Sequence, residues 1–225
     1  MVSGINQFAL DLYGRLGKKG KNLFFSPLSI STALAMTYAG AYGKTADQMH
    51  QTLHFGLKRE EVHAAFYALM KENNPAQDKS TFQLNLANRI FVQQGRPLLA
   101  DFKARLHKYY GCAAQSVDFG KQEAAAAKIN GWVARQTHQK INKIVQPSMF
   151  DSLTRLVLAN AIYFKGKWRY LFKKRNTRPR GFYLTPKKKV NVDTMYQKAK
   201  FRYRSTSTHK ILEMDYKGGD LSMVV

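Results

Sequence analysis

The sequence predicts an α+β fold, in which helices with interspersed strands come first and clustered strands come last. Apolar residues recur at helical spacing through much of the first 140 residues. From residue 180 onward, short apolar runs separated by turn or polar residues are typical of a β-meander. No regular alternation of strands and helices supports a doubly wound sheet. With 44% hydrophobic residues, the 225-residue chain can bury one sizeable core or two modest ones. It has no internal repeat and no low-complexity linker, and we expect residues 1–225 to form one domain.

Helices are predicted at the start of the chain. The first carries apolar residues at helical spacing and stops at Gly17; they are Ile5, Phe8, Ala9, Leu12 and Leu16. The second begins at Ser26, whose side chain can cap free backbone N–H groups, and Pro27 suits the first helical position. Thr45 and Gln48 form a capping-box pattern ahead of a third helix, and a fourth is expected over residues 62–70.

Strands and helices then alternate irregularly. Residues 82–92 show strand periodicity, and residues 99–111 and 121–141 show helical patterns. Residues 156–164 are almost wholly apolar, which predicts a strand covered on both faces in the middle of a sheet. The later strands are expected at 190–192, 201–203 and 211–214.

The charge of the chain is strongly positive and unevenly distributed. Lys and Arg number 37 against 14 Asp and Glu, which gives a net charge of +23. Residues 165–204 hold 15 basic residues and one acidic residue, Asp193, so 14 of the 23 net charges lie there. Polyanions are therefore the partners that electrostatics favours, either nucleic acid, sulfated polysaccharide or an anionic membrane.

Patterns typical of enzymes and metal sites are incomplete in this sequence. GAYGKT at 40–45 ends like a phosphate-binding loop, but Tyr38 stands where the first glycine belongs, and a helix precedes it where a strand is required. His50 and His54 have the spacing of zinc ligands, but Gln51 replaces the glutamate base of a metalloprotease. No nucleophile elbow or paired carboxylates occur, so the chain is not expected to be an enzyme or to need a cofactor or metal.

Few sequence features indicate the cellular location of the protein. Cys112 has no second cysteine to pair with, and it is most simply a structural thiol. The first 16 residues form an amphipathic pattern rather than a signal peptide. Asn22–Gly43 lacks charge, but its serines, threonines and proline favour a buried helix over a membrane span.

Segments spread over the whole chain resemble those of the serpins, a family of protease inhibitors. The similar segments are FALDLY, NLFFSPLSISTALAM, ANRIFV, KYYG, VDF, INGWVARQTHQKI, LVLANAIYFKGKW and YKGGDLSMVV, in the family's order. The resemblance implies N-terminal helices packed on a large central mixed sheet, with a second antiparallel sheet. It also implies a partial domain, incomplete at the C-terminus, because a serpin carries its reactive-centre loop and two further strands of the main sheet after LSMVV.

The resemblance assigns conformational roles to four residues. Ser26, Ser29 and Asn160 fall on family positions at the centre of the main sheet, which must part to admit the reactive loop. Trp168 matches the tryptophan at the top of that sheet, where insertion begins. Ordinary core packing is the alternative for all four. We expect Asn160 to form a hydrogen bond within the centre of the sheet, near Ser26 or Ser29.

The sequence also departs from the family pattern. Asp215 stands where proline is common, Tyr196 replaces the second methionine of a usual pair, and the stretch after Trp168 is unusually basic. These differences leave the predicted fold unchanged and weaken assignment to a particular branch.

Three functions follow as hypotheses. The first is a suicide inhibitor of trypsin- or chymotrypsin-like serine proteases, with an extracellular location expected from the family and a cytoplasmic one left open. The second is a non-inhibitory serpin or fragment that binds heparin or another sulfated polysaccharide. Its site would comprise basic residues of the 165–204 stretch, namely Lys173, Lys174, Arg175, Arg178, Arg180, Lys187, Lys188 and Lys189. The third, nucleic-acid binding, has charge in its favour but no recognisable reading motif.

Overall fold

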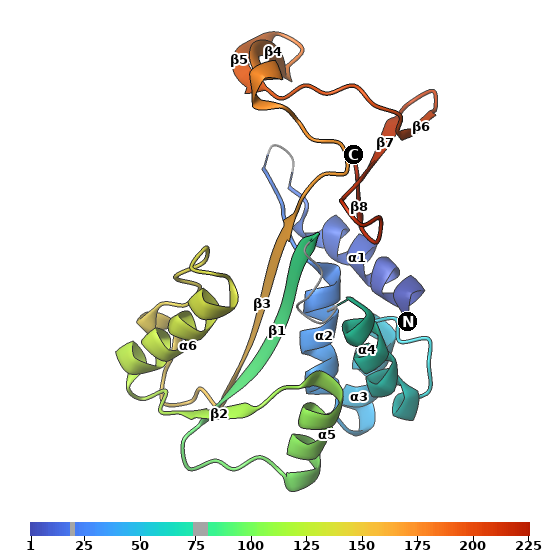
Figure 1. The fold of residues 1–225 in the computed structure, drawn as a ribbon. Coiled ribbons are helices and arrows are strands. Elements are labelled where there is room, and N and C mark those ends of the chain that lie inside the picture. The colour runs from blue at the N-terminus through green and yellow to red at the C-terminus, as the bar shows by residue number, and fades with distance from the viewer. Residues whose placement is uncertain (19–20, 74–80) are drawn as a thin grey trace. The chain divides into compact units, whose positions relative to one another are not determined.

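The computed structural model describes residues 1–18, 21–73 and 81–225, and it divides into two compact units. The first unit comprises residues 1–75 and 84–163, and the second comprises residues 76–83 and 164–225. Figure 1 shows the elements of both. The expectation of one domain stays a prediction.

The first unit holds six α-helices among its described residues. They are α1 (Val2–Leu16), α2 (Pro27–Tyr38), α3 (Gly43–Thr52), α4 (Arg59–Asn73), α5 (Ala100–Tyr110) and α6 (Gln122–Gln136). Their ends follow local chemistry. The N–H of Gly17 closes α1 by donating to the Tyr13 carbonyl, and Gly111 ends α5 in the left-handed conformation at φ +57°, which glycine adopts without strain.

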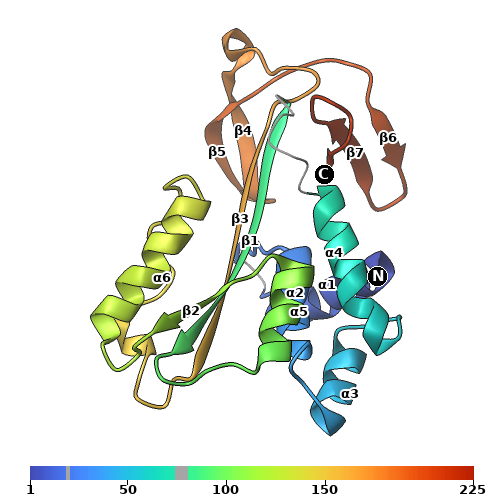
Figure 2. The same cartoon turned by 60° about the horizontal axis from the view of Figure 1, so that its bottom comes forward.

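A three-stranded sheet separates two layers of helices. Its order is β2 (Ala114–Val117), β1 (Phe82–Gln93) and β3 (Leu156–Gly166). β1 and β2 are parallel, with Ile90 opposite Ala114. The N–H of Gln93 donates to the Arg155 carbonyl at the start of β3. Figures 1 and 2 both show α6 on one side of this sheet and α1–α5 on the other.

Side chains alternate between the two faces of β1 and build one core on each. Ile90 and Val92 join the core formed by α1–α5, against which Leu158 of β3 also packs. Phe91 joins a second core with Ala159 and Ala161 of β3 and with α6, which contributes Ile129, Trp132 and Val133. Even-numbered residues of both strands therefore face α1–α5, and odd-numbered residues face α6.

The described residues of the second unit form two antiparallel sheets. β4 (Arg178–Thr185) and β5 (Lys188–Thr194) form a hairpin, preceded by the short 3₁₀ helix η2 (Lys174–Asn176). β6 (Arg202–Ser205), β7 (Lys210–Asp215) and β8 (Ser222–Val224) form a three-stranded meander. The single meander expected from the sequence is thus two sheets, because no pairing joins β5 to β6.

Two helix boundaries predicted from the sequence are wrong. The capping box fails because the Ala46 N–H already donates to the Tyr42 carbonyl, so α3 begins at Gly43 and Thr45 lies inside it. α6 ends at Gln136 and not near 141, because His138 and Gln139 have left-handed backbone at φ 48° and 62°.

The prediction for residues 156–164 is half right. They form a strand, but β3 is an edge strand of the described sheet rather than a central one. Leu156 and Phe164 are 37% and 40% exposed, so both ends of this apolar run reach solvent.

Candidate functional site

The start of α2 has the capping geometry that the sequence predicts. The Ser26 hydroxyl accepts a hydrogen bond from the Ser29 N–H at 3.3 Å, and Pro27 occupies the first turn. The hydroxyls of Ser29 and Ser31 are buried and have no hydrogen-bond partner among the described residues. A buried hydroxyl without a partner carries a desolvation cost, so neither hydroxyl is expected to stabilise this helix.

Asn160 forms a hydrogen bond inside the sheet, but its partner is not a serine of α2. Its Nδ2 donates to Oδ1 of Asn88 at 2.7 Å, which joins β3 to β1 side chain to side chain. The expected hydrogen bond of Asn160 within the sheet is therefore confirmed, and its position near Ser26 or Ser29 stays a prediction. Asn88 and Asn160 are even-numbered residues on their strands, and they lie on the face that carries α1–α5.

Asn88 is the residue that sequence reasoning missed. It stands in ANRIFV, two residues before Ile90 and four before Val92, on the same face of a recognisable strand. A polar residue in register with buried apolar ones was the available signal. The identity of its partner was not, because 72 residues separate it from Asn160.

Trp168 follows β3 by two residues, in the second unit, and is stacked on Tyr216. Their ring centroids are 4.4 Å apart with the planes 12° from parallel, and the two residues form an isolated antiparallel bridge. The ring of Phe164 meets Tyr216 edge-on at 4.9 Å. Burial raises the pKa of the Tyr216 hydroxyl. A Cβ on Gly166 would lie 2.7 Å from the Tyr216 ring, so glycine is required for this close approach.

Asp215, one of the departures from the family pattern, has a clear structural role. Its carboxylate accepts a hydrogen bond from Arg202 at 2.6 Å and another from Arg169 at 3.3 Å. Arg202 also contacts the Glu213 carboxylate at 2.7 Å. Asp215 therefore links the segment after Trp168 to the meander, which a proline could not do.

The basic residues singled out from the sequence are all exposed, and they surround the β4–β5 hairpin. Lys173, Lys174 and Arg175 lie on and next to η2, Arg178 and Arg180 on β4, Lys187 in the turn, and Lys188 and Lys189 on β5. None of the eight forms an ion pair with a described residue. They are consequently free to meet an external anion.

The hairpin does not place all its cations on one face. Strand register puts Arg178, Arg180 and Lys188 on one face and Lys189 on the other. The Lys189 side chain lies over Gly181, and its Nζ is 5.5 Å from the centre of the Tyr183 ring. A single flat anion could therefore contact only part of the set.

The histidines with zinc-like spacing have separate partners. His50 Nε2 lies 2.9 Å from the Leu57 carbonyl, and His54 Nε2 lies 2.7 Å from the Asp11 carboxylate. Among described residues, no three His, Cys, Asp or Glu side chains are grouped to hold a metal ion. No described helix is both long and apolar enough to cross a membrane.

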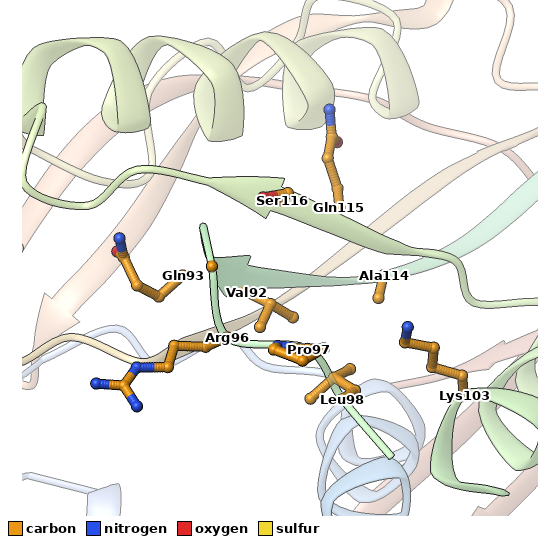
Figure 3. A pocket seen from close by; sticks show the side chains of 10 residues that line it. Val92, Gln93, Arg96, Pro97, Leu98, Lys103, Ala114, Gln115 and Ser116 are labelled. Carbon is orange, nitrogen blue, oxygen red and sulfur yellow. The ribbon is translucent and has the colours of Figure 1, made fainter. Parts of the chain in front are cut away.

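A small cavity of about 280 Å³ lies where β1 leaves the sheet (Figure 3). Val92, Pro97 and Leu98 gather there, but its glutamines are used elsewhere. Gln93 bonds to Asp118 and to the Phe119 N–H, and Gln115 accepts from Arg89. The charged side chains of its lining are Arg96 and Lys103.

Comparison with known proteins assigns the chain. The profile of the Serpin family, described as serine protease inhibitors, matches residues 3–225. Leukocyte elastase inhibitor A of Rattus norvegicus is 43% identical over 230 residues, which cover 100% of this chain and 60% of the rat protein. Leukocyte elastase inhibitor of Xenopus laevis is 41% identical, with the same two coverages.

Solved structures agree. Cleaved Serpin 42Da superposes with a TM-score of 0.90 at 39% identity, covering 98% of this chain and 60% of that one. Ovalbumin from emu, Dromaius novaehollandiae, gives 0.92 at 30% identity, covering 99% and 62%. The chain thus spans about three-fifths of the length of these relatives and has their α+β architecture. The matched family is described as one of serine protease inhibitors, not of enzymes. This chain belongs to the serpin family.

Proposed function

We propose that these residues are the N-terminal three-fifths of an inhibitory serpin that traps a chymotrypsin- or trypsin-like serine protease. The observation that supports this most is the match of residues 3–225 to a family of serine protease inhibitors, and the second strand edge of β3 is where such a mechanism would act. One side of β3 pairs with β1, and no described strand pairs with the other. An unpaired strand edge offers a row of N–H and C=O groups to an incoming strand. Inhibition by loop insertion is this kind of strand addition.

In this mechanism the protease attacks a bait loop and forms an acyl-enzyme. The cleaved loop then inserts into the sheet as a new strand, and stored strain is released as the attached enzyme is deformed. The role proposed for this chain is to supply the receiving sheet. The Asn88–Asn160 bond keeps β1 and β3 in register, and the Trp168–Tyr216 stack fixes the end of β3. Ser26 caps α2 by accepting a hydrogen bond from the Ser29 N–H.

Elastase is the first protease to test, because the relatives at 41–43% identity are named leukocyte elastase inhibitors. The experiment joins the unmatched two-fifths of the rat relative after Val225 and incubates the fusion with elastase, chymotrypsin or trypsin. We expect a covalent adduct that survives a denaturing gel. The rat segment supplies the bait loop, so the result reports whether this chain's sheet can accept it.

The 225 residues alone are the matched control. These residues contain no segment that matches the reactive-centre loop of a serpin, so they are expected to give no adduct. A fusion that is digested without an adduct would contradict the inhibitory proposal and favour a non-inhibitory serpin.

A second candidate function is binding of heparin or another sulfated polysaccharide by the β4–β5 hairpin. The eight exposed cations without ion pairs support it. Counterion release predicts that the logarithm of affinity falls with the logarithm of salt, with a slope of about 0.9 per neutralised phosphate in the DNA case. An extracellular location, expected from the family, has no independent support and stays a prediction.

The two faces of the hairpin allow a sharp test on a heparin column. Substituting Arg178, Arg180 and Lys188 by Gln removes the cations of one face, and Lys189→Gln removes the cation of the other. We expect the triple variant to elute at clearly lower salt and Lys189→Gln to change elution little. Elution of the triple variant at the salt concentration of the parent would contradict a hairpin site.

A further inference from the structure

A second cationic surface lies in the first unit, well separated in sequence from the hairpin. A cavity of about 400 Å³ is lined by residues of α4 and α5 together with Tyr42, which precedes α3. Its cations are Arg59, Arg105 and Lys108, and its one acidic residue is Glu60. Neither the fold of the sheet nor the proposed inhibition uses this cavity.

The two arginines are fixed by the protein but not neutralised by it. Arg105 Nη1 donates to the Ala39 carbonyl at 3.1 Å, and Arg59 Nη2 donates to the Ala41 carbonyl. A guanidinium has five N–H donors, so each keeps donors to spare. Neither arginine, nor Lys108, forms an ion pair with any residue in the described part of the chain. The site therefore has positive charge in place before any ligand arrives.

Aromatic rings complete the lining. The Arg59 guanidinium lies 5.1 Å from the centroid of the Tyr42 ring, and Tyr42 itself is 68% exposed. Lys108 Nζ lies 4.9 Å from the Tyr109 ring. Planar side chains at the rim of a cavity provide stacking surface for a flat ligand.

The floor of the cavity includes a buried imidazole. His63 Nδ1 lies 2.7 Å from the Tyr110 hydroxyl, and Nε2 has no hydrogen-bond partner among the described residues. Burial, with Arg105 and Arg59 nearby, lowers the pKa of His63 to about 4. The ring is thus neutral near pH 7, and a neutral imidazole nitrogen can donate or accept one further hydrogen bond.

We propose that this cavity binds a small aromatic phosphate monoester. The phosphate would accept hydrogen bonds from Arg59, Arg105 and Lys108, since guanidinium groups match phosphate oxygens in charge and geometry. The ring would lie against Tyr42 or Tyr109. A volume near 400 Å³ is within the range of small-molecule sites and is far below what a folded partner needs.

The test measures binding of phenyl phosphate by titration calorimetry, with inorganic phosphate and phenol as separate probes. Lys108→Glu reverses an exposed charge at the cavity, and Lys103→Glu makes the same change on the same helix outside it. Figure 3 shows Lys103 at the other cavity, beside Ala114. Both lysines are exposed, so neither substitution removes a buried contact.

We expect saturable binding of phenyl phosphate that is tighter than that of either probe. Lys108→Glu should weaken it about tenfold or more, which corresponds to about 1.4 kcal/mol, while Lys103→Glu leaves it within about twofold. Absence of saturable binding, equal loss in both variants, or equal affinity for inorganic phosphate would overturn the proposal. A sulfated disaccharide that binds more tightly than phenyl phosphate would also overturn the choice of an aromatic ligand.

Discussion

Asn160 and Asn88 form a polar contact between two strands on a face that is otherwise apolar. Replacing Asn160 with Leu leaves the Asn88 amide without its partner, which costs about 1–3 kcal/mol when the group is buried. In the fusion with the rat segment, we expect lower stability to urea and faster appearance of polymer or latent forms on mild heating. An unchanged rate would reduce Asn160 to a packing residue.

A double-mutant cycle separates the amide pair from simple packing. Asn88→Leu combined with Asn160→Leu should cost less than the two single changes added together, because both partners are then apolar. Asn85→Leu is the matched control, since Asn85 lies on the same strand but donates to the Gln136 carbonyl of α6. Its effect should add to that of Asn160→Leu.

His63 predicts a dependence of stability on pH. Its pKa in the folded chain is about 4, against 6.5 for a free imidazole, and burial is the main cause. Between these values the unfolded chain binds more protons, so the free energy of unfolding falls as pH drops from 6.5 towards 4. The contribution is at most about 3 kcal/mol.

Urea unfolding of parent and His63→Gln across this range checks the dependence. The variant should lose this part of the slope, whereas Tyr110→Phe, which keeps the imidazole buried, should retain it. A slope that is equal in parent and His63→Gln would show that other groups cause it.

Among the elements, α2 allows a paired test of its serines. Ser26→Ala removes the cap on the Ser29 N–H and should cost about 1 kcal/mol. Ser29→Ala removes a buried hydroxyl without a partner, so we expect an unchanged or higher free energy of unfolding. Thermal unfolding of both variants tests this prediction. A larger loss of stability for Ser29→Ala than for Ser26→Ala would contradict it.

The elements predicted correctly are those whose signals are local. The stop of α1 at Gly17 and the cap of α2 at Ser26 each depend on a few adjacent residues. The strand at 82–92 was likewise evident from its alternation. Local residue preferences are therefore enough to predict where these helices begin or end and where this strand lies.

The errors concern pairing between distant segments or backbone geometry at helix ends. Nothing within residues 156–164 tells whether a strand lies at the edge or in the centre of a sheet, because that depends on which other strands are present. The partner of Asn160 is equally remote in sequence. The end of α6 depends on left-handed backbone at His138 and Gln139, which neither residue type requires.

The sequence indicated which residues belong to the candidate site, but not which side chains they contact. The positions of Ser26, Ser29, Asn160 and Trp168 came from likeness to a family, and their proposed roles stay predictions. Asn88, Tyr216 and the division of the basic residues between two hairpin faces required coordinates. The periodicity of one strand does not predict which residues of another strand lie opposite it.

At the scale of the whole molecule, the β4–β5 hairpin of the second unit exposes apolar side chains to solvent. Every residue of β4 is exposed, and Phe182, Tyr183 and Leu184 are each more than half exposed. A two-stranded hairpin in water is marginally stable at best. Large exposed apolar patches favour association.

We therefore expect the 225 residues alone to bind the dye ANS and to self-associate as concentration rises. Dye fluorescence and sedimentation velocity measure the two effects. The fusion with the rat segment should show less of both. A 225-residue chain that stays monomeric without binding dye would show that these side chains find cover within the chain.

The Asn88–Asn160 pair has a further consequence for a protein with a net charge of +23. Attraction between such a chain and any polyanion weakens as ionic strength rises. Two amides carry no net charge and do not titrate near neutral pH, so the bond between them is nearly indifferent to salt and to acidity. If that bond limits how readily the sheet rearranges, the rearrangement rate should be constant across buffers that change polyanion affinity many-fold. Polyanion binding would then depend on ionic strength, whereas the rearrangement of the sheet would not.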